Sequence, residues 1–333
     1  ASAWVDTAVD LFEPELKAVN EAASPALNAL TGFGEAPQAV TSIYNKKNPF
    51  IAEIGEVQKI TGRDSLKDVR HVEISLEESG LQYQAGDSLG VYFLNDSLAV
   101  DEVLDLLKIS ADEPVRVGDE DKPVRQALIE DFELTQSYPG FVEKFAAATG
   151  NATLAEIAAD KAVLREYLED RQIYDVIRQN PGEITAQALI DSLRKQQPRL
   201  YSIASSQKEV EEEVHLTVAV VEFDTHDNAH LGGCSGFLGR RVEEGDKVRV
   251  YVEHNDSFRL PENPQAPVIM VGPGTGIAPF RSFLQDREVD GVEGNSWLFF
   301  GNPHFTQDFL YQVELQSYLK SGVLSKLSVA FSR

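Results

Sequence analysis

The pattern of hydrophobic and polar positions changes character along the chain. Between residues 53 and 91 apolar and polar residues roughly alternate, as in residues 69–76, which is typical of antiparallel β-strands. Residues 97–194 instead repeat their apolar positions every three to four residues, which predicts helices. Strand patterns return at Arg199, at 214–221 and at 247–253. The pattern therefore predicts one β domain that is interrupted by a block of helices.

After Pro267 the pattern becomes one of alternating strands and helices. Residues 268–271, 297–300 and 327–331 are short strand-like runs, and they are separated by helical patterns that start near Pro279 and Asp308. Such alternation predicts a parallel sheet covered by helices, so the fold class is α/β and multi-domain. Because the chain stops just after the third run, we expect this domain to be incomplete.

Three local signals complete the expected organisation. Residues 4–16 carry a helical pattern, and residues 17–48 are rich in Ala, Asn, Gly and Pro, as in a linker. Residues 153–156 (Thr-Leu-Ala-Glu) have the form of a capping box, which would start a helix at Thr153.

Charge and composition exclude several classes of function. The 333 residues carry a formal net charge of −24, which argues against binding to nucleic acid or to anionic membranes. The acidity suits a basic protein partner, although it also serves solubility alone. No apolar run is long enough to span a membrane, and residues 1–10 lack a basic stretch followed by an apolar one, so we expect no signal peptide there. A single cysteine, Cys234, allows no internal disulfide, so we expect a reducing, cytoplasmic setting. The first residue is not Met, so we expect the natural chain to begin upstream.

Residues 272–281 (Gly-Pro-Gly-Thr-Gly-Ile-Ala-Pro-Phe-Arg) form a glycine loop between an apolar strand and a helix. Glycines let the backbone approach a pyrophosphate, and a helix N-terminus offers N–H groups to it. The loop matches neither GxGxxG nor a P-loop. A tight turn without a ligand remains the alternative.

Residues 199–202 (Arg-Leu-Tyr-Ser) lie where the chain re-enters the β domain. They supply a cation for a pyrophosphate, an aromatic plane for a flavin ring and a hydroxyl for its reactive nitrogen. Alternation along a strand places Arg199 and Tyr201 on one face and Ser202 on the other. An ordinary edge strand would carry the same spacing.

Residues 232–238 contain a second glycine loop, which is either a cap for a pyrophosphate or a plain turn into a helix. Within it we expect Cys234 to be a small packing residue and not a nucleophile. His226 and His230 have Asp224 and Asp227 nearby, but the segment has the composition of a loop and lacks the HExxH spacing, so we expect no metal site.

Together these residues resemble the ferredoxin-NADP reductase-like diflavin reductases. Residues 199–206 look like the flavin signature of that family, and residues 272–281 look like its nicotinamide loop. Residues 253–261 and 300–305 favour its sulfite reductase branch over cytochrome P450 reductase. The resemblance runs from about Phe50 to Arg333, and residues 4–16 resemble the last helix of the FMN-binding flavodoxin domain that precedes this module in the family.

The resemblance implies a role for each site residue. Arg199 binds the FAD pyrophosphate, Tyr201 stacks on the isoalloxazine ring next to Leu200, and Ser202 is the catalytic residue near the flavin nitrogen. The remaining FAD contacts are Thr135, Thr217, Val218, Ala219, Gly232, Gly233, Cys234 and Ser235. The nicotinamide cleft is lined by Gly274, Thr275, Gly276 and Arg281, and Ser332 and Arg333 bind the 2′-phosphate of NADPH. Two departures stand out: Phe223 replaces a tyrosine that is frequent in the family, and the later NADPH-binding segments are absent.

The resemblance also implies a function and a set of domains. Electrons would pass from NADPH through FAD, and then through FMN in a flavodoxin domain, to a sirohaem and iron–sulfur hemoprotein subunit that reduces sulfite to sulfide. The alternatives are a P450-reductase-type donor and a non-catalytic FAD-bound scaffold. The implied divisions are a flavodoxin remnant at 1–16, a linker at 17–48, an FAD-binding β-barrel at 49–95 and 196–264, a helical insertion at 96–195, and an incomplete NADPH-binding α/β domain at 265–333.

Overall fold

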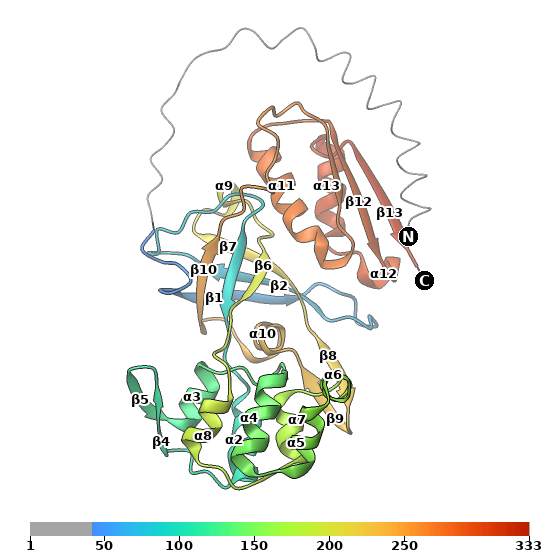
Figure 1. Ribbon diagram of the computed structural model, residues 1–333. Helices are drawn as coiled ribbons and strands as arrows, with labels where there is room; N and C mark the ends of the chain where they lie inside the picture. The colour runs from blue at the N-terminus through green and yellow to red at the C-terminus, as the bar shows by residue number, and fades with distance from the viewer. Residues whose placement is uncertain (1–41, 333) are drawn as a thin grey trace. The chain divides into compact units, whose positions relative to one another are not determined.

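Residues 42–332 are described by the computed structural model of the chain (Figure 1). The predicted helix at 4–16, nearly all of the predicted linker and Arg333 lie outside the described residues. The first part of the fold is a six-stranded antiparallel sheet in the order β6-β3-β10-β1-β2-β7. Its strands are β1 (Phe50–Lys59), β2 (Val69–Ser75), β3 (Ser88–Tyr92), β6 (Arg199–Ser202), β7 (Glu213–Ala219) and β10 (Lys247–Glu253).

The two edge strands of this sheet are joined where β6 ends. A β-bridge links Ile203 to Leu216 of β7, so the sheet curls back on itself as a barrel. Alternate side chains point inward and form its core, in which Ile54, Leu89 and Val250 are fully buried. Alternation therefore predicted both the strands and their inward faces.

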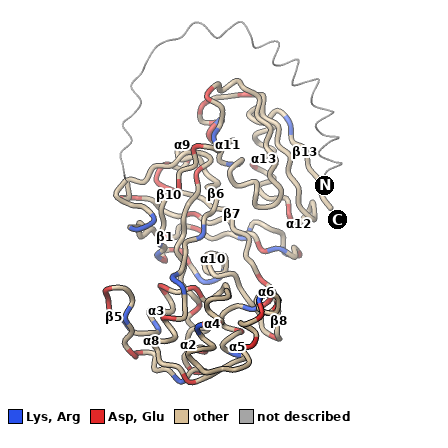
Figure 2. Tube along the Cα trace, in the orientation of Figure 1, with Lys and Arg blue, Asp and Glu red and all other residues tan. Residues whose placement is uncertain are grey.

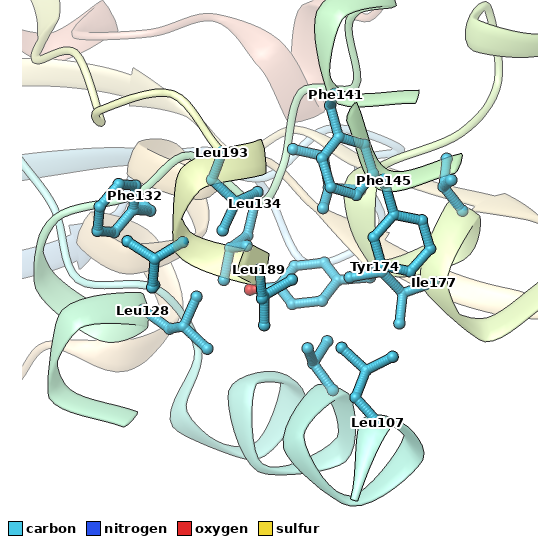
Figure 3. Close-up of a cluster of buried hydrophobic side chains, with 14 of the residues drawn as sticks. Leu107, Leu128, Phe132, Leu134, Phe141, Phe145, Tyr174, Ile177, Leu189 and Leu193 are labelled. Atoms are coloured by element: carbon cyan, nitrogen blue, oxygen red, sulfur yellow. The ribbon is translucent and has the colours of Figure 1, made fainter. Parts of the chain in front are cut away.

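A helical insertion lies between β3 and β6. Its helices pack around one apolar core in which Phe141 and Phe145 stack with ring centroids 5.3 Å apart (Figure 3). The helices are α2 (Ser97–Leu107), α3 (Val124–Glu130), α4 (Pro139–Thr149), α5 (Ala152–Ala159), α6 (Lys161–Leu168), α7 (Ile173–Gln179) and α8 (Ala186–Ser192). The helical pattern did not indicate the hairpin of β4 (Pro114–Val117) and β5 (Glu120–Pro123).

The capping-box prediction at residues 153–156 was wrong. Helix α5 begins one residue after Asn151, whose side-chain oxygen accepts a hydrogen bond from the N–H of Leu154 at 3.0 Å. Asn ranks with Ser among the best N-cap residues, and here it precedes Thr153 in the chain. Thr153 therefore lies inside the first turn of the helix.

The second part of the fold is the parallel α/β domain. Strands β11 (Val268–Val271), β12 (Ser296–Asn302) and β13 (Lys326–Phe331) pair in parallel, in that order. Helices α11 (Ala278–Val289) and α13 (Gln312–Ser321) pack on the sheet face that carries Met270, Leu298 and Phe300. With the antiparallel barrel, this sheet confirms the predicted α/β fold class.

The last predicted helix begins later than expected. In place of one helix from Asp308, a short α12 (Phe305–Asp308) is followed by α13 (Gln312–Ser321). Tyr311 separates them because its backbone is left-handed, with φ of 53°. A left-handed residue cannot continue a right-handed helix, and a hydrophobic pattern does not reveal such a residue.

Short elements complete the barrel and the α/β domain. They are α9 (Gln207–Val210), the hairpin of β8 (Glu222–Thr225) and β9 (Asn228–Leu231), α10 (Gly233–Gly236), the π-helical turn η1 (Phe237–Arg241) and, at the nicotinamide-type loop, the 3-10 turn η2 (Gly274–Ile277). Acidic residues are distributed over the insertion, the barrel and the α/β domain (Figure 2). Within residues 42–332 no helix combines the length and the hydrophobicity needed to cross a membrane.

Buried polar side chains line the junction between the barrel and the α/β domain. The Tyr311 hydroxyl lies 2.7 Å from the Thr217 hydroxyl and 3.0 Å from Nδ1 of His71, and these two residues face each other across β7 and β2. The rings of His71 and His215 meet edge to face, with centroids 4.9 Å apart. Burial, assisted by the positive charge of Arg281, lowers the pKa of His71 to about 4 and lowers the pKa of His215 in the same direction.

The buried histidines at this junction predict that the folded protein loses stability at acid pH. His71 is neutral in the folded protein and regains its ordinary pKa of 6.5 on unfolding, so its contribution to stability is present above that pH and is lost as the pH falls through about 4. Each such histidine steepens the pH dependence of the free energy of unfolding by up to about 1.4 kcal/mol per pH unit. Urea denaturation between about pH 7 and about pH 4.5 measures this slope.

The variant His71→Asn should flatten that slope relative to the unchanged protein. In the described part of the chain, four carboxylates act on the two rings, those of Glu56, Glu73, Glu213 and Glu314. They are present in both proteins, so the comparison with the unchanged protein also removes their own contribution to the slope. His226→Asn is the matched control, since His226 lies in the β8–β9 turn with φ of 51°, a conformation that Asn adopts readily. An equally steep slope in His71→Asn would contradict the interpretation.

Candidate functional site

Strand β6 carries the predicted flavin signature on the edge of the sheet next to β3. Arg199 and Tyr201 are half-buried on one face, while Leu200 and Ser202 are exposed on the other. The strand therefore presents its residues in the predicted alternation. The exposed hydroxyl of Ser202 lies at the end of the strand, next to the buried segment that follows it.

Arg199 is held by a carboxylate of the helical insertion. Its Nη2 donates to Oε2 of Glu133 at 3.0 Å, and Glu133 is 1% exposed. The other oxygen of Glu133 accepts from the backbone N–H and the hydroxyl of Thr135, at 2.9 Å and 2.8 Å. Glu133 thus brings together two predicted site residues that are far apart in sequence. Sequence reasoning missed its role, because a carboxylate next to a cofactor-binding segment carries no local signal.

Tyr201 contacts the predicted glycine loop through Cys234. The Tyr201 hydroxyl and the Cys234 thiol are hydrogen-bonded, and burial raises the pKa of the thiol to about 12. A thiol with this pKa stays protonated at neutral pH and is no nucleophile. The contact fixes the orientation of the Tyr201 ring.

The second glycine loop is closely packed against both the barrel and the insertion. A Cβ atom on Gly233 would lie 2.5 Å from the ring of Phe93 and 2.8 Å from the hydroxyl of Thr135. Only glycine fits at this position. The Ser235 hydroxyl accepts a hydrogen bond from the N–H of Val221 at 3.1 Å and ties the loop to the end of β7.

A cavity of about 110 Å³ opens beside this loop. The Tyr174 hydroxyl is buried there, and it has no hydrogen-bond partner among the described residues. Arg241 donates to the carbonyls of Leu94 and Gly233 at 3.0 Å and 3.1 Å, and burial lowers the pKa of its guanidinium. A partly buried cation and an unpaired hydroxyl suit an anionic group such as a pyrophosphate. The lining residues are Asp96, Ala99, Thr135, Gln172, Tyr174, Arg178, Ala229, His230, Leu231, Gly233 and Arg241.

The three predicted residues of β7 do not face the same way. Val218 is fully buried in the barrel core, so only its backbone can meet a ligand. Thr217 is buried at the junction, where its hydroxyl bonds to Tyr311. Ala219 is exposed and lines a second cavity, of about 410 Å³, together with Gly274 and Thr275 of the first glycine loop.

That second cavity continues into a third, of about 460 Å³, which Ser332 lines. The two cavities share Lys67, Pro273, Gly274 and Asn302. They lie beside the carboxyl ends of β11 and β12, which is where parallel α/β sheets bind ligands. The Lys67 ammonium donates to Oδ1 of Asn302 at 2.8 Å and supplies a positive charge to both cavities. No pattern in the sequence pointed to Lys67.

Two predicted nicotinamide residues lie apart from these cavities. Gly276 is exposed and lines neither of them. Arg281 is buried, with its guanidinium bonded to the carbonyl of Ala204 and to Glu314. The structure therefore brings Gly274, Thr275 and Ser332 together but places Arg281 elsewhere.

The histidines of the β8–β9 hairpin bind carboxylates of the insertion. His230 lies 2.7 Å from Asp175, and both are buried; His226 lies 3.2 Å from Asp170. Among residues 42–332, the donors that gather within 4.8 Å belong instead to His71, Glu73 and His215 at the junction. The positive charge of Arg281 acts on both of these histidines, so we assign no metal to the group.

Two family models match parts of the chain. The family model described as "FAD binding domain" matches residues 43–237, and the one described as "Oxidoreductase NAD-binding domain" matches residues 270–329. The first contains β6, Thr135 and the second glycine loop, and the second contains the first glycine loop.

Curated relatives are similar over the whole chain. The sulfite reductase (NADPH) flavoprotein alpha-component of Salmonella typhimurium is 53% identical over 333 residues, and that of Serratia proteamaculans is 51% identical over 336 residues. The protein of the same name from Zymomonas mobilis is 49% identical over 333 residues. The chain is covered completely in each comparison but spans only 54–55% of these relatives. With more than half of its residues matched by the first family model, the chain belongs to the family of proteins with this FAD-binding domain, and an oxidoreductase NAD-binding domain follows it.

Proposed function

We propose that this chain is the NADPH-oxidising, FAD-binding module of a diflavin reductase that supplies electrons to a sulfite reductase. The observation that carries the proposal is the cavity that Ala219 of the barrel shares with Gly274 and Thr275 of the α/β domain. A cavity lined by both domains allows a nicotinamide to meet a flavin. The names of the relatives support the identity of the electron acceptor.

The division of the chain follows from the same proposal. The FAD-binding barrel takes residues 49–95 and 196–264, the helical insertion takes 96–195, and the NADPH-binding domain takes 265–333. Residues 1–16 would belong to an FMN-binding flavodoxin domain and 17–48 to a linker. The partner would be a sirohaem-containing hemoprotein subunit in a hetero-oligomer. The place of action would be the cytoplasm.

FAD, when bound, would supply the redox chemistry, and the side chains would position it. Arg199 and the cavity lined by Arg241 and Tyr174 would hold the pyrophosphate, with Thr135 and residues 232–235 around it. Tyr201 would stack on the ring beside Leu200, and residues 217–219 would border it. Ser202 would place its exposed hydroxyl at the reactive edge of the ring. Gly274 to Gly276 would take the nicotinamide end of NADPH, and Ser332 and Arg333 its 2′-phosphate.

The test is anaerobic addition of NADPH to the whole flavoprotein, loaded with FAD and FMN, followed by the sirohaem subunit. We expect the flavin absorbance to bleach with NADPH and to recover when the sirohaem subunit and sulfite are added. Recovery with a haem-thiolate enzyme in place of the sirohaem subunit would identify a P450-type donor. An FAD-bound protein that NADPH does not bleach would be a scaffold, and the proposal would fail.

Arg199→Ala should weaken FAD binding by about tenfold to about a hundredfold, since one charge-assisted hydrogen bond is lost. The substitution also leaves Glu133 buried without its cation, so the double variant Arg199→Ala/Glu133→Gln separates the two effects. FAD retention after gel filtration measures binding. Arg194→Ala is the control, because Arg194 is exposed five residues earlier in the chain and stacks on Tyr138. Full FAD retention in both Arg199 variants would refute the role.

Ser202→Ala should leave FAD bound and slow its reduction by NADPH at least about tenfold, since a hydrogen bond at the reactive edge is lost. Stopped-flow absorbance measures the rate. Reduction by dithionite, which needs no nicotinamide, should be unchanged and serves as the control. A reduction rate by NADPH equal to that of the unchanged protein would eliminate Ser202 from the reaction.

A further inference from the structure

Helix α11 connects the two halves of the proposed site. It begins at Ala278, directly after the 3-10 turn η2 that holds the last glycine of the first glycine loop. Its buried face packs against residues 203–206, which directly follow Ser202 of β6 and are fully buried. The loop at one end of this contact would hold the nicotinamide, and the strand at the other end carries Ser202, which would lie nearest the flavin.

Consecutive residues of the two segments are hydrogen-bonded to each other. The Ser282 hydroxyl donates to the carbonyl of Ser205 at 2.6 Å. The N–H of Ser206 donates to Oε1 of Gln285 at 2.8 Å, and its hydroxyl donates to Asp286 at 2.6 Å. Buried backbone groups need such partners, so the contact has little freedom to slide.

Arg281 makes the link closest to Ser202. Its Nη1 donates to the carbonyl of Ala204 at 2.7 Å, and its Nε donates to Glu314 of α13 at 2.9 Å. The guanidinium also lies over the ring of Tyr311, 4.9 Å from its centroid. A buried cation that is paired with a carboxylate and a carbonyl keeps one orientation. Arg281 therefore joins α11, α13 and the segment after β6 at a single point.

The opposite side of the same segment is fixed to the barrel. The N–H of Ala204 donates to the carbonyl of His215 at 2.8 Å, and the N–H of Ile203 donates to that of Asp87 at 3.1 Å. Ala204 is thus bonded to β7 through its N–H and to Arg281 through its carbonyl. Any displacement of α11 at Arg281 is carried to a residue two positions from Ser202.

We propose that Arg281 is a positioning residue, which sets the placement of the nicotinamide loop relative to Ser202 without touching either cofactor. The inference rests on the proposed function and revises one part of it, since the sequence places Arg281 in the nicotinamide cleft. The side chain is 10% exposed, and two of its nitrogens are committed to protein partners. A small error in placing reactants lowers a reaction rate steeply but leaves binding nearly intact.

A positioning residue and a residue that binds NADPH predict opposite kinetic changes on substitution. In the FAD-loaded flavoprotein, Arg281→Lys should lower the limiting rate of FAD reduction at saturating NADPH by about tenfold or more. The NADPH concentration at half-maximal rate should stay within about twofold, because no bond to NADPH is lost. Flavin retention and reduction by dithionite should match the unchanged protein. Glu314→Gln, which keeps an acceptor for Nε but removes the charge, should give a smaller loss of the same kind.

Arg287→Lys is the matched control. Arg287 lies on the same helix, is 3% exposed and donates to the carbonyl of Gly294 at 2.7 Å, within the α/β domain alone. Its substitution should leave the limiting rate unchanged. If Arg281→Lys does not fold, Ser282→Ala tests the same junction by removing only the hydroxyl bond to Ser205, and should lower the same rate.

Three results would overturn the inference. A raised half-saturating concentration with an unchanged limiting rate in Arg281→Lys would make Arg281 a ligand of NADPH. If Arg281→Lys reduces FAD at the rate of the unchanged protein, the junction does not set the placement of the nicotinamide loop relative to Ser202. Where Arg281→Lys does not fold, an unchanged rate in Ser282→Ala would show the same. An unchanged protein that NADPH fails to reduce would remove the proposed function itself, and is distinguished from the other two because it needs no variant.

Discussion

The burial of residues 203–206 is the constraint on which the rest of the structure depends. These four residues are inaccessible to water, so their backbone groups must find partners inside the protein. The partners come from three places: Asp87 and His215 of the barrel, residues of α9, and the side chains of α11. Barrel closure and attachment of the second domain are therefore satisfied by the same short segment. Because residues 203–206 directly follow β6, their fixed position also holds the end of the predicted flavin strand in place.

The parts of the fold that the sequence predicted are those with a local cause. Alternation in β2 and β10 follows from one buried face, and the apolar run of β11 and the glycines after it follow from a parallel strand that turns into a helix. The features of the fold that the sequence did not predict depend on distant partners or on a single backbone angle. Asn151 displaced Thr153 as the helix cap, and Tyr311 split a helix through a left-handed φ of 53°.

The same distinction applies to the candidate site. Residues 199–202 and the two glycine loops are short motifs, so a pattern can identify them. Three other residues of the site are brought there by tertiary contacts. Glu133 of the insertion bonds to Arg199 of β6, and Lys67, in the loop after β1, bonds to Asn302 of the parallel sheet. Tyr174 lines the cavity beside the second glycine loop. Single charged or aromatic residues are common in any chain, so only their placement distinguishes them.

Arg199 and Arg281 differ in their exposure and in the partners that hold them. Arg199 keeps 30% of its side chain exposed, and besides its bond to Glu133 the guanidinium makes only one other hydrogen bond among the described residues, a long one of 3.4 Å from Nη1 to the carbonyl of Gln197. Arg281 is bonded to a carboxylate at Nε and to a carbonyl at Nη1, and its side chain is 10% exposed. An anionic ligand that approached Arg281 would have to displace Glu314 or separate α11 from residue 204. Arg199 is thus open to the anionic ligand that we propose for it, while the charge of Arg281 is paired inside the protein, where it links α11 to residue 204 and to α13.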